Sequence, residues 1–518
     1  MRRVPNLGRR SVLKAGSLLL TGMGIGGVSV SAMAAPVYGG HLRVAGVVGS
    51  ASESLDPARQ SMATDYMRGY LFYDGLMSLD DQLEPHPALA ETLESDDLLT
   101  WQIRLRRNVR FHDGTPLTAE DVVFSLLRHQ KPSTGSQQYA LATTMRSVRA
   151  LTPNSVEIVL ESPNSDFPSI LGISNFAILK AGTTDFSVAN GTGPFRCQEF
   201  SPGIRTVGVR NTEFWGTAPY LESVELLAIP DEMARHNALI SGDVDVIASA
   251  NPRLVQMLKK NGFGIMENAI STYTDLAIRL DERYGRSRDL VDGIKYLLNR
   301  EQIRQSVFLG FARIGNDQPI APESPYFNTQ LPQRPYDPDR ARFLLKRSGF
   351  WGETIPLVCS PAALASVDIA VVLQYAASRI GQSMSVRRVP ADGYWTQYWM
   401  KAPLGFGNIN PRPAPSLTFE LGFSSKSPWN ESRWSNPQFD DLLRAAKSTR
   451  DTIKKRQIYW DMQALVAEGS GVCIPNFTNS LDAHAPHVCG LRPSQAGELM
   501  GYNFARFVWL DTGRRSVQ

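Results

Sequence analysis

The chain has little of the side-chain chemistry on which enzymes and metal proteins depend. It contains 7 histidines and 4 cysteines in 518 residues, and no two cysteines have the CxxC spacing of a zinc or redox site. It also lacks a GxSxG nucleophile elbow, an HExxH zinc motif and a P-loop. We therefore expect a protein that is not an enzyme and that carries no metal and no cofactor.

The sequence beyond residue 34 lacks both a membrane-spanning apolar run and an excess of positive charge. Five of the 54 Lys and Arg residues lie within residues 1–34, which contain no acid, so 49 basic residues face 50 acidic ones in the remainder. Binding to nucleic acid or to an anionic membrane needs a concentrated basic surface. We expect neither nucleic acid as a partner nor a chain that itself spans the membrane.

Residues 1–34 have the order of parts that is typical of a twin-arginine export signal. Arg9-Arg10 precedes a mildly apolar stretch over 15–30, and Ala32-Met33-Ala34 supplies a small-x-small cleavage site. The alternative is a disordered basic tail. No cysteine stands at the cleavage site, so we expect a periplasmic protein without a lipid anchor.

Strand and helix patterns alternate along the rest of the chain, which favours an α/β fold. In residues 99–105, Trp101, Ile103 and Leu105 share one face of a predicted strand. Further strands are expected over 41–46 and 156–160, and helices over 118–130, 231–241, 337–349 and around 458–466.

The cysteines and one histidine pair leave alternatives open. Buried thiols are the favoured interpretation, with a Cys473–Cys489 bridge as the alternative. His484 and His487 have a metal-like spacing but no acid cluster nearby, so a surface loop is favoured and a nickel-type ligand is the alternative.

Several sequence blocks, in order, resemble family 5 of the extracytoplasmic solute-binding proteins of ABC importers. This family includes dipeptide-, oligopeptide-, nickel- and opine-binding proteins. The most diagnostic block is LRRNVRFHDGTPLTAEDVV over 105–123, and Asn299-Arg300-Glu301 departs mildly from the usual Asp-Arg-Glu. The other blocks are Glu53–Pro57, Tyr73–Leu76, Pro87–Glu91, Gly191–Phe195, Phe214–Trp215, Ala218–Leu221, Ile240–Val246, Tyr336–Ala341 and Leu345–Gly349.

The resemblance implies a two-lobed periplasmic binding protein of the Venus-flytrap type with an extra subdomain. By analogy, lobe I comprises residues 35–75, 185–270 and 480–518, and residues 76–184 form its accessory subdomain. Lobe II comprises residues 271–479. The solute is then held in a cleft between the lobes, which close around it by a hinge motion.

Residues 385–436 are expected to carry most of the ligand contacts. The Asp that holds the ligand amine in dipeptide-binding relatives is absent from this region, and Asn430 or Glu431 is a positional guess for its substitute. Arg412, held between prolines, suits a carboxylate or phosphate. The predicted ligand-binding residues are Tyr66, Tyr394, Trp395, Arg412, Trp429, Asn430 and Glu431.

Two groups of candidate residues also have a structural interpretation. Tyr394, Trp395, Tyr398 and Trp399 have helical spacing, which favours burial in the core for any one of them. Asn476 and Asn479 are expected where a crossing strand returns to lobe I, and turn chemistry is favoured over ligand contact for both.

The sequence thus predicts the solute-binding component of an ABC importer, which captures a short peptide or peptide-like solute and delivers it to the permease subunits in the inner membrane. An opine, a sugar-phosphate conjugate or a metal chelate is the alternative cargo. The alternatives from other classes are a periplasmic chaperone-like protein and a hydrolytic protein. We expect a monomer.

Overall fold

The computed structural model describes residues 35–47, 49–410 and 412–511. The described residues from Pro36 onward form one compact unit. The predicted export signal, residues 1–34, lies outside the described residues. Within the described ranges, no helix has the length and apolarity needed to cross a membrane.

Seven strands form the first large sheet, and all of them fall in the ranges expected for lobe I. The predicted strand over 41–46 is confirmed as β1, which pairs in parallel with β10 and β11. The order is β12 (Gly264–Asn268), β20 (Ser480–His484), β11 (Val246–Ile247), β1 (His41–Gly46), β10 (Ser223–Ala228), β9 (Arg205–Arg210) and β8 (Phe195–Ser201).

The second large sheet lies in the range expected for lobe II. Its central strand β13 (Tyr273–Ile278) is buried at every position, so the sheet is covered on both faces. The order is β14 (Ala312–Ile314), β19 (Asn476–Thr478), β13, β17 (Leu404–Ile409), β15 (Ile355–Cys359) and β16 (Met384–Arg388), and β18 (Val472–Cys473) pairs with β13.

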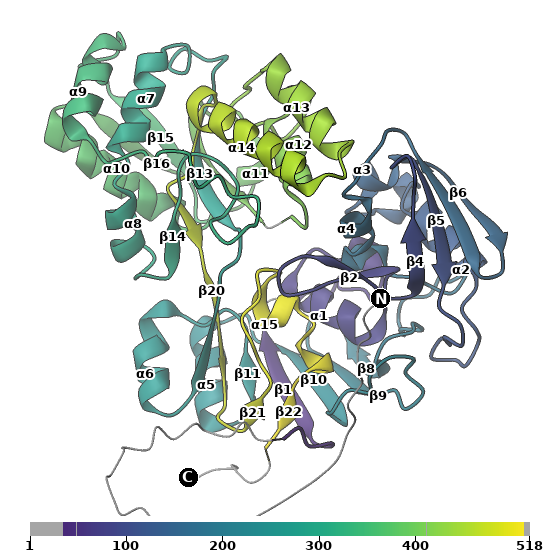
Figure 1. The fold of residues 1–518 in the computed structure, drawn as a ribbon. Helices are drawn as coiled ribbons and strands as arrows, with labels where there is room; N and C mark the ends of the chain where they lie inside the picture. Colours follow the sequence, from purple (N-terminus) through teal and green to yellow (C-terminus); the bar gives the residue numbers. More distant parts are fainter. Residues whose placement is uncertain (1–34, 48, 411, 512–518) are drawn as a thin grey trace, which may run out of the picture. The chain divides into compact units, whose positions relative to one another are not determined.

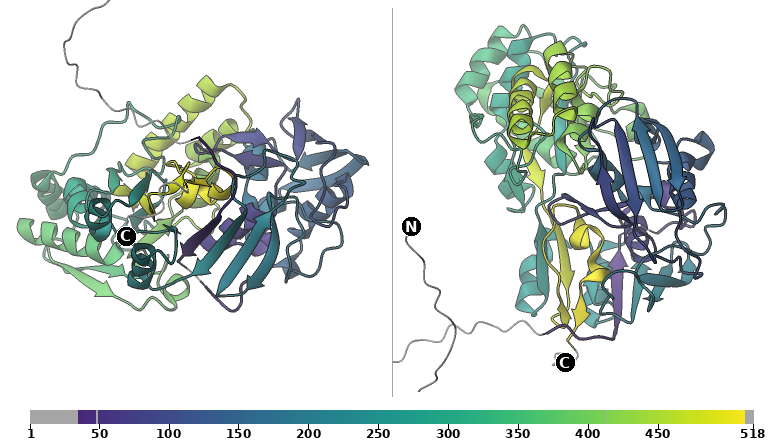
Figure 2. Two further views of the ribbon diagram at one scale, coloured as in Figure 1. Left: turned by 90° about the horizontal axis from the view of Figure 1, so that it is seen from below. Right: turned by 45° about the vertical axis from the view of Figure 1, so that its right-hand side comes forward.

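A separate four-stranded antiparallel sheet forms within residues 76–184, which we call the accessory segment. Its strands lie side by side in Figure 2, in the order β4 (Ala90–Glu94), β5 (Thr100–Leu105), β7 (Ser155–Leu160) and β6 (Met145–Thr152). Trp101, Ile103 and Leu105 are buried on one face of β5, as predicted. The division into lobes and accessory segment at particular residues stays a prediction.

The predicted helix starts are confirmed where a capping side chain marks them. Asp231 accepts the amide of Ala234 at 2.7 Å, and Asp337 accepts that of Arg340 at 2.9 Å. The principal helices are α1 (Ala63–Phe72), α2 (Ala119–Arg128), α5 (Glu232–Ser241), α6 (Val255–Lys260), α7 (Arg288–Leu297), α8 (Arg300–Ser306), α9 (Pro338–Arg347), α10 (Ser366–Ile380), α11 (Tyr394–Gln397), α12 (Pro415–Phe423), α13 (Pro437–Lys447), α14 (Thr452–Gly469) and α15 (Glu498–Gly501).

The chain crosses between the two large sheets at two adjacent places (Figure 1). Residues 269–272 lead from β12 to β13, and Asn479 alone separates β19 from β20. Arg313 of β14 contacts both crossings, because it donates to the carbonyl of Ile270 at 2.5 Å and to the side chain of Asn479. These crossings are the short connections through which a hinge rotation between the sheets would act.

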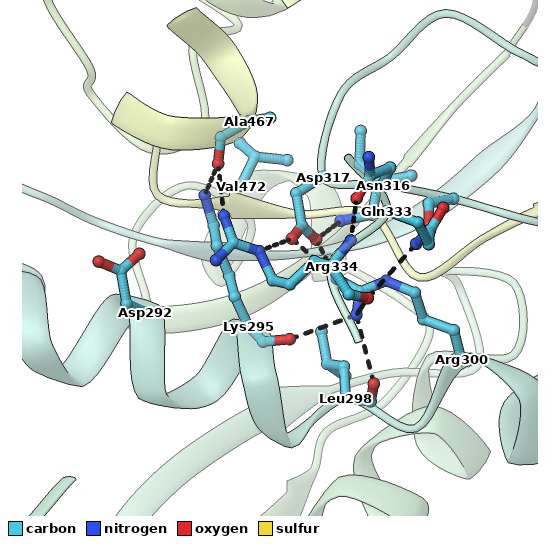
Figure 3. A network of polar contacts seen from close by, with 12 residues as sticks. Asp292, Lys295, Leu298, Arg300, Asn316, Asp317, Gln333, Arg334, Ala467 and Val472 are labelled. Atoms are coloured by element: carbon cyan, nitrogen blue, oxygen red, sulfur yellow. Dashed lines mark hydrogen bonds and ion pairs between the residues drawn. The ribbon is translucent and has the colours of Figure 1, made fainter. Parts of the chain in front are cut away.

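A buried cluster around Asp317 fixes the strand that enters the second crossing (Figure 3). Its carboxylate accepts from Arg300 at 2.7 and 2.8 Å and from Arg334 at 3.0 Å. It also accepts the amide of Ile474, two residues before β19, at 3.2 Å. The strand leading into the crossing is therefore held by charge-assisted hydrogen bonds on its lobe II side.

Two local expectations are wrong. His484 belongs to strand β20, paired with β11 and β12, rather than to a surface loop, and His487 contacts Asp245 at 3.1 Å. Asn476 is a buried residue of strand β19, rather than a turn residue, because the crossing strand forms a ladder with β14. Cys359 and Cys473 are buried thiols as predicted, whereas Cys197 and Cys489 are only half-buried.

Candidate ligand-binding site

Arg412 lies between β17 and α12, where it is close to tyrosines of both lobes. Burial lowers the pKa of its guanidinium, while Tyr66 of α1 and Tyr273 of β13 raise it. Burial also raises the pKa of the Tyr66 hydroxyl, and the charge of Arg412 opposes that shift. The Arg412 Nε is buried and meets no hydrogen-bond partner among the described residues. The structure therefore brings together Arg412 and Tyr66, two of the predicted residues, with a donor still to be satisfied.

On the lobe I side, Tyr66 stacks on Tyr502, with ring centroids 5.4 Å apart. Tyr502 has a φ of 70°, and Leu499 and Met500 before it also have positive φ. Such backbone costs about 1–3 kcal/mol per residue and persists only where the surroundings impose it. Here Asp482 accepts the amide of Leu499 at 2.7 Å. The strained segment holds an aromatic ring against Tyr66.

On the lobe II side, Glu431 forms a buried acid pair with Asp275 of β13. Asp275 is 0% exposed and Glu431 is 4% exposed. Burial raises the pKa of both carboxyls, and the negative charge of Glu431 raises that of Asp275 further. Neither Asp275 oxygen accepts from a donor of the described residues, while Trp399 Nε1 donates to Glu431. Burial and the neighbouring acid therefore favour the protonated form of Asp275.

The backbone beside this acid pair leaves room for it only because residue 407 is glycine. Gly407 of β17 pairs with Asp275 across the sheet. A Cβ at this position would lie 2.0 Å from Oε1 of Glu431 and 2.8 Å from Oδ1 of Asp275. Both distances are shorter than a van der Waals contact, so the acid pair and the glycine belong to one arrangement.

An aromatic row leads from the acid pair to the surface. Trp399 lies 5.7 Å from Trp429 and 5.5 Å from Trp395 between ring centroids. Trp395 and Trp429 are each 41% exposed, so they can offer apolar surface to a partner molecule. Tyr394 at the inner end is fully buried, and its hydroxyl donates to the carbonyl of Phe406 at 2.6 Å. This row contains three of the predicted residues.

Asn430 has its hydrogen bonds satisfied within its own loop. Its amide donates to the carbonyls of Ser424 at 3.1 Å and Trp434 at 2.6 Å, and its Oδ1 accepts the amide of Trp434 at 3.2 Å. The side chain is 2% exposed. The contacts around Asn430 are those of a residue that shapes the loop carrying Trp429 and Glu431.

A cavity of about 600 Å³ opens beside Arg412, which is within the size of small-ligand pockets. Of the predicted ligand residues, Arg412 lines it and the other six do not. The walls come mainly from the accessory segment and lobe II. They include Leu98, Trp101, Ser165, Asp166, Ser271, Tyr326, Pro413, Thr418, Arg450 and Lys455.

Sequence reasoning missed Asp275, Tyr273 and Asp166. An acid inside the apolar strand YTDLAI is an available signal for Asp275, since a buried carboxyl requires a partner. Asp166 offers no comparable local signal. Within the described ranges, no group of three or more His, Cys, Asp or Glu side chains is arranged to hold a metal ion.

Comparison with known proteins agrees with this architecture. The family model for bacterial extracellular solute-binding proteins, family 5, matches residues 84–431. A dipeptide-binding protein of Escherichia coli is 26% identical over 427 residues, covering 73% of this chain and 78% of the relative. A glutathione-binding protein of the same species is 25% identical over 479 residues, covering 86% and 90%.

Solved structures show the same two-lobed fold. A periplasmic binding protein from Helicobacter pylori, in complex with the peptide STSA, has a TM-score of 0.78 at 21% identity, covering 92% of this chain and 99% of its own. A Campylobacter jejuni protein, in complex with nickel and L-histidine, has a TM-score of 0.76 at 22% identity, covering 90% and 99%.

Proposed function

The chain belongs to family 5 of the bacterial extracellular solute-binding proteins, and on this premise we propose that it captures a short peptide or peptide-like solute through an anionic group bound by Arg412. Members of this family work with the permease subunits of ABC importers, and this chain has the two-lobed fold of the family. The captured solute is then delivered to such a permease.

The proposal rests on the burial and the hydrogen bonding of Arg412. The guanidinium is half-buried, lies close to tyrosines of both lobes, and has an Nε that meets no hydrogen-bond partner in the part of the chain that the structure describes. Such a group favours an anion that completes its hydrogen bonds. A charge pair in a shielded cleft gains more than one on the surface, although desolvation offsets part of the gain. A ligand carboxylate is the anion that a peptide supplies.

The remaining predicted residues take two kinds of role in the proposal. Tyr66, Trp395 and Trp429 lie outside the cavity that Arg412 lines, and in the proposal they supply aromatic surface to the part of the solute that extends beyond it. Tyr394, Asn430 and Glu431 support that surface from within, since their polar groups are engaged by the protein itself. Glu431 is therefore proposed as part of an acid pair rather than as the direct substitute for an amine-binding Asp.

Location and assembly follow from the family and from the expected signal. We propose a periplasmic monomer exported by the twin-arginine route, with cleavage after Ala34. An extracytoplasmic location is common to the family. Mass spectrometry of the protein recovered from the periplasm would give the mature N-terminus.

The test is a thermal melt of natively purified protein with trialanine, glutathione or nickel–histidine. A binder melts later as the ligand concentration rises, by about 2.7 kcal/mol of added stability at 100 times Kd. We expect saturable stabilisation by trialanine and none by its C-terminal amide, which lacks the carboxylate. Stabilisation by nickel–histidine alone would support the metal-chelate alternative, and consumption of trialanine would support a hydrolase.

Arg412→Ala is expected to weaken trialanine binding about ten-fold or more, because the carboxylate loses its charged partner. Isothermal titration calorimetry would measure the change. Arg342→Ala, an exposed arginine of α9, is the matched control and should leave Kd unchanged. Equal affinities for Arg412→Ala and the wild type would refute the assigned role of Arg412.

A further inference from the structure

Asp166 belongs to the accessory segment, but its carboxylate is bonded to lobe II. Its Oδ1 accepts from Lys455, and its Oδ2 accepts from the hydroxyl of Ser416 and, at 3.3 Å, from that of Tyr459. Asp166 is 7% and Lys455 is 6% exposed, so the ion pair is nearly dry. Three donors of lobe II therefore converge on one acid of the accessory segment.

The neighbouring Ser165 adds two further hydrogen bonds across the same contact. Its amide donates to the carbonyl of Lys447 at 2.7 Å, and its hydroxyl accepts from Lys455 at 2.8 Å. Lys447 ends α13, and Lys455 lies in the first turns of α14. The contact is thus a small buried network rather than a single surface pair.

The chain segment that carries Arg412 is part of this network. Ser416 stands four residues after Arg412, at the second position of α12. Ala414 and Leu417, on either side of Pro415, are packed in the apolar cluster of the accessory segment, which includes Leu98, Trp101 and Phe167. A hydrogen bond and apolar packing therefore both attach residues 414–417 to the accessory segment.

We propose that Asp166 is a positioning residue of the solute-binding site, which fixes Arg412 through Ser416. The inference rests on the proposed function, since it gives Arg412 the role of binding the anionic group. Arg412, Asp166 and Lys455 line the same cavity, so the network forms a wall of the site rather than a distant contact. The stiffness of the prolines at 413 and 415 carries the position of Ser416 back to Arg412.

A buried ion pair could also serve stability alone, and the two explanations differ in one respect. If Asp166 only holds the accessory segment to lobe II, the loss of either hydroxyl that donates to its Oδ2 should change solute binding equally. If Asp166 positions Arg412, losing the donor on the Arg412 segment has a larger effect on binding than losing the donor on α14. The two donors are the hydroxyl of Ser416, on the segment that carries Arg412, and the hydroxyl of Tyr459, on α14.

The experiment compares Ser416→Ala with Tyr459→Phe, since each variant removes one hydroxyl that donates to the same oxygen. We expect Ser416→Ala to raise the Kd for trialanine about five-fold and Tyr459→Phe to change it less than two-fold. Calorimetry measures Kd, and urea unfolding shows that both variants are folded. Equal changes in Kd would overturn the proposal.

A second readout needs no solute, so it separates this proposal from the proposed function. Phenylglyoxal modifies accessible arginines, and mass spectrometry gives its rate at Arg412. We expect faster modification in Ser416→Ala than in Tyr459→Phe or the wild type. If trialanine fails to bind the wild type, this difference still supports the positioning role. Equal rates in the three proteins would overturn that role.

The role of Asp166 itself is tested by Asp166→Leu combined with Lys455→Met. Apolar replacement of both partners avoids a buried unpaired charge, so the double variant should fold. We expect the same five-fold rise in Kd and the same faster modification of Arg412 as in Ser416→Ala. A double variant with wild-type Kd and wild-type modification would overturn the proposal.

Discussion

Asp317 and Asp275 are both fully buried acids of lobe II, but their surroundings are opposite. Asp317 accepts from two arginines and one backbone amide, at distances of 2.7–3.2 Å. Asp275 faces another acid, Glu431, and neither of its oxygens accepts from a donor of the described residues. The first site pairs a buried negative charge with cations, whereas the second disfavours the charge, because burial and the neighbouring acid raise the pKa of Asp275.

The difference separates two reasons for burying an acid. A carboxylate that is fully paired with arginines can stay charged and can join distant segments, as Asp317 joins α8 to the strand before the crossing. A carboxyl without a cation costs stability, so it persists only where something else favours it. The Asp275–Glu431 pair supports Trp399 and thereby the aromatic row.

The largest effect is expected from Asp317→Asn, which leaves the buried Arg300 and the half-buried Arg334 beside a neutral group (Figure 3). Breaking a buried ion pair on one side typically costs about 3–5 kcal/mol. Urea unfolding monitored by circular dichroism would measure the loss. Asp292→Asn breaks the exposed Arg288–Asp292 pair in the same lobe and should cost about 0.5 kcal/mol or less. Similar losses for the two variants would contradict the comparison.

The elements around these sites could be predicted because their signals are local. Asp231 and Asp337 cap helices within three residues of themselves, and the two-residue alternation of 99–105 marks one strand face. The two-lobed fold came from ordered sequence blocks rather than from periodicity. Arg412 could be selected because flanking prolines and charge are visible in the sequence.

The rest of the site could not be predicted because its partners are far apart in the chain. Asp166 and Ser416 are separated by 250 residues, and no local pattern pairs them. Glu431 was predicted as a ligand residue, yet its neighbour Asp275 comes from a strand in a distant part of the sequence. Only the packed lobe shows that Glu431 is buried.

The second prediction concerns the pH dependence of the acid pair. The folded-state pKa of Asp275 lies above its unfolded value, so the folded state binds the extra proton. Stability is therefore lost as pH rises from the unfolded pKa of about 4 towards the folded value, by about 1.4 kcal/mol for each unit of the shift. Asp275→Asn cannot ionise, so we expect its stability relative to wild type to rise between pH 5 and pH 8.

Urea unfolding of both proteins at pH 5, 6, 7 and 8 would measure this relative change. The acids other than Glu431, whose titration depends on Asp275, titrate equally in both proteins, so they cancel in the difference. Asp292→Asn serves again as the control and should follow the wild type across the range. A constant difference between Asp275→Asn and the wild type would mean that folding does not raise the pKa of Asp275.

The smallest effect is expected from filling the space beside the acid pair. The Cβ of Gly407→Ala would lie 2.0 Å from Oε1 of Glu431, so the carboxyl must move and its contact with Trp399 must loosen. Overpacking of this kind costs about 1–3 kcal/mol.

Gly422→Ala in α12 meets nothing within 4 Å and should instead stabilise the chain by about 0.5–1 kcal/mol, because alanine is the better helix former. Opposite signs in urea unfolding would show that the glycine at 407, unlike the one at 422, is required by the acid pair. If Gly407→Ala leaves the free energy of unfolding unchanged, Glu431 can move away from Asp275 at little cost. Asp275 and Asp317 would then differ only in the charge of their surroundings.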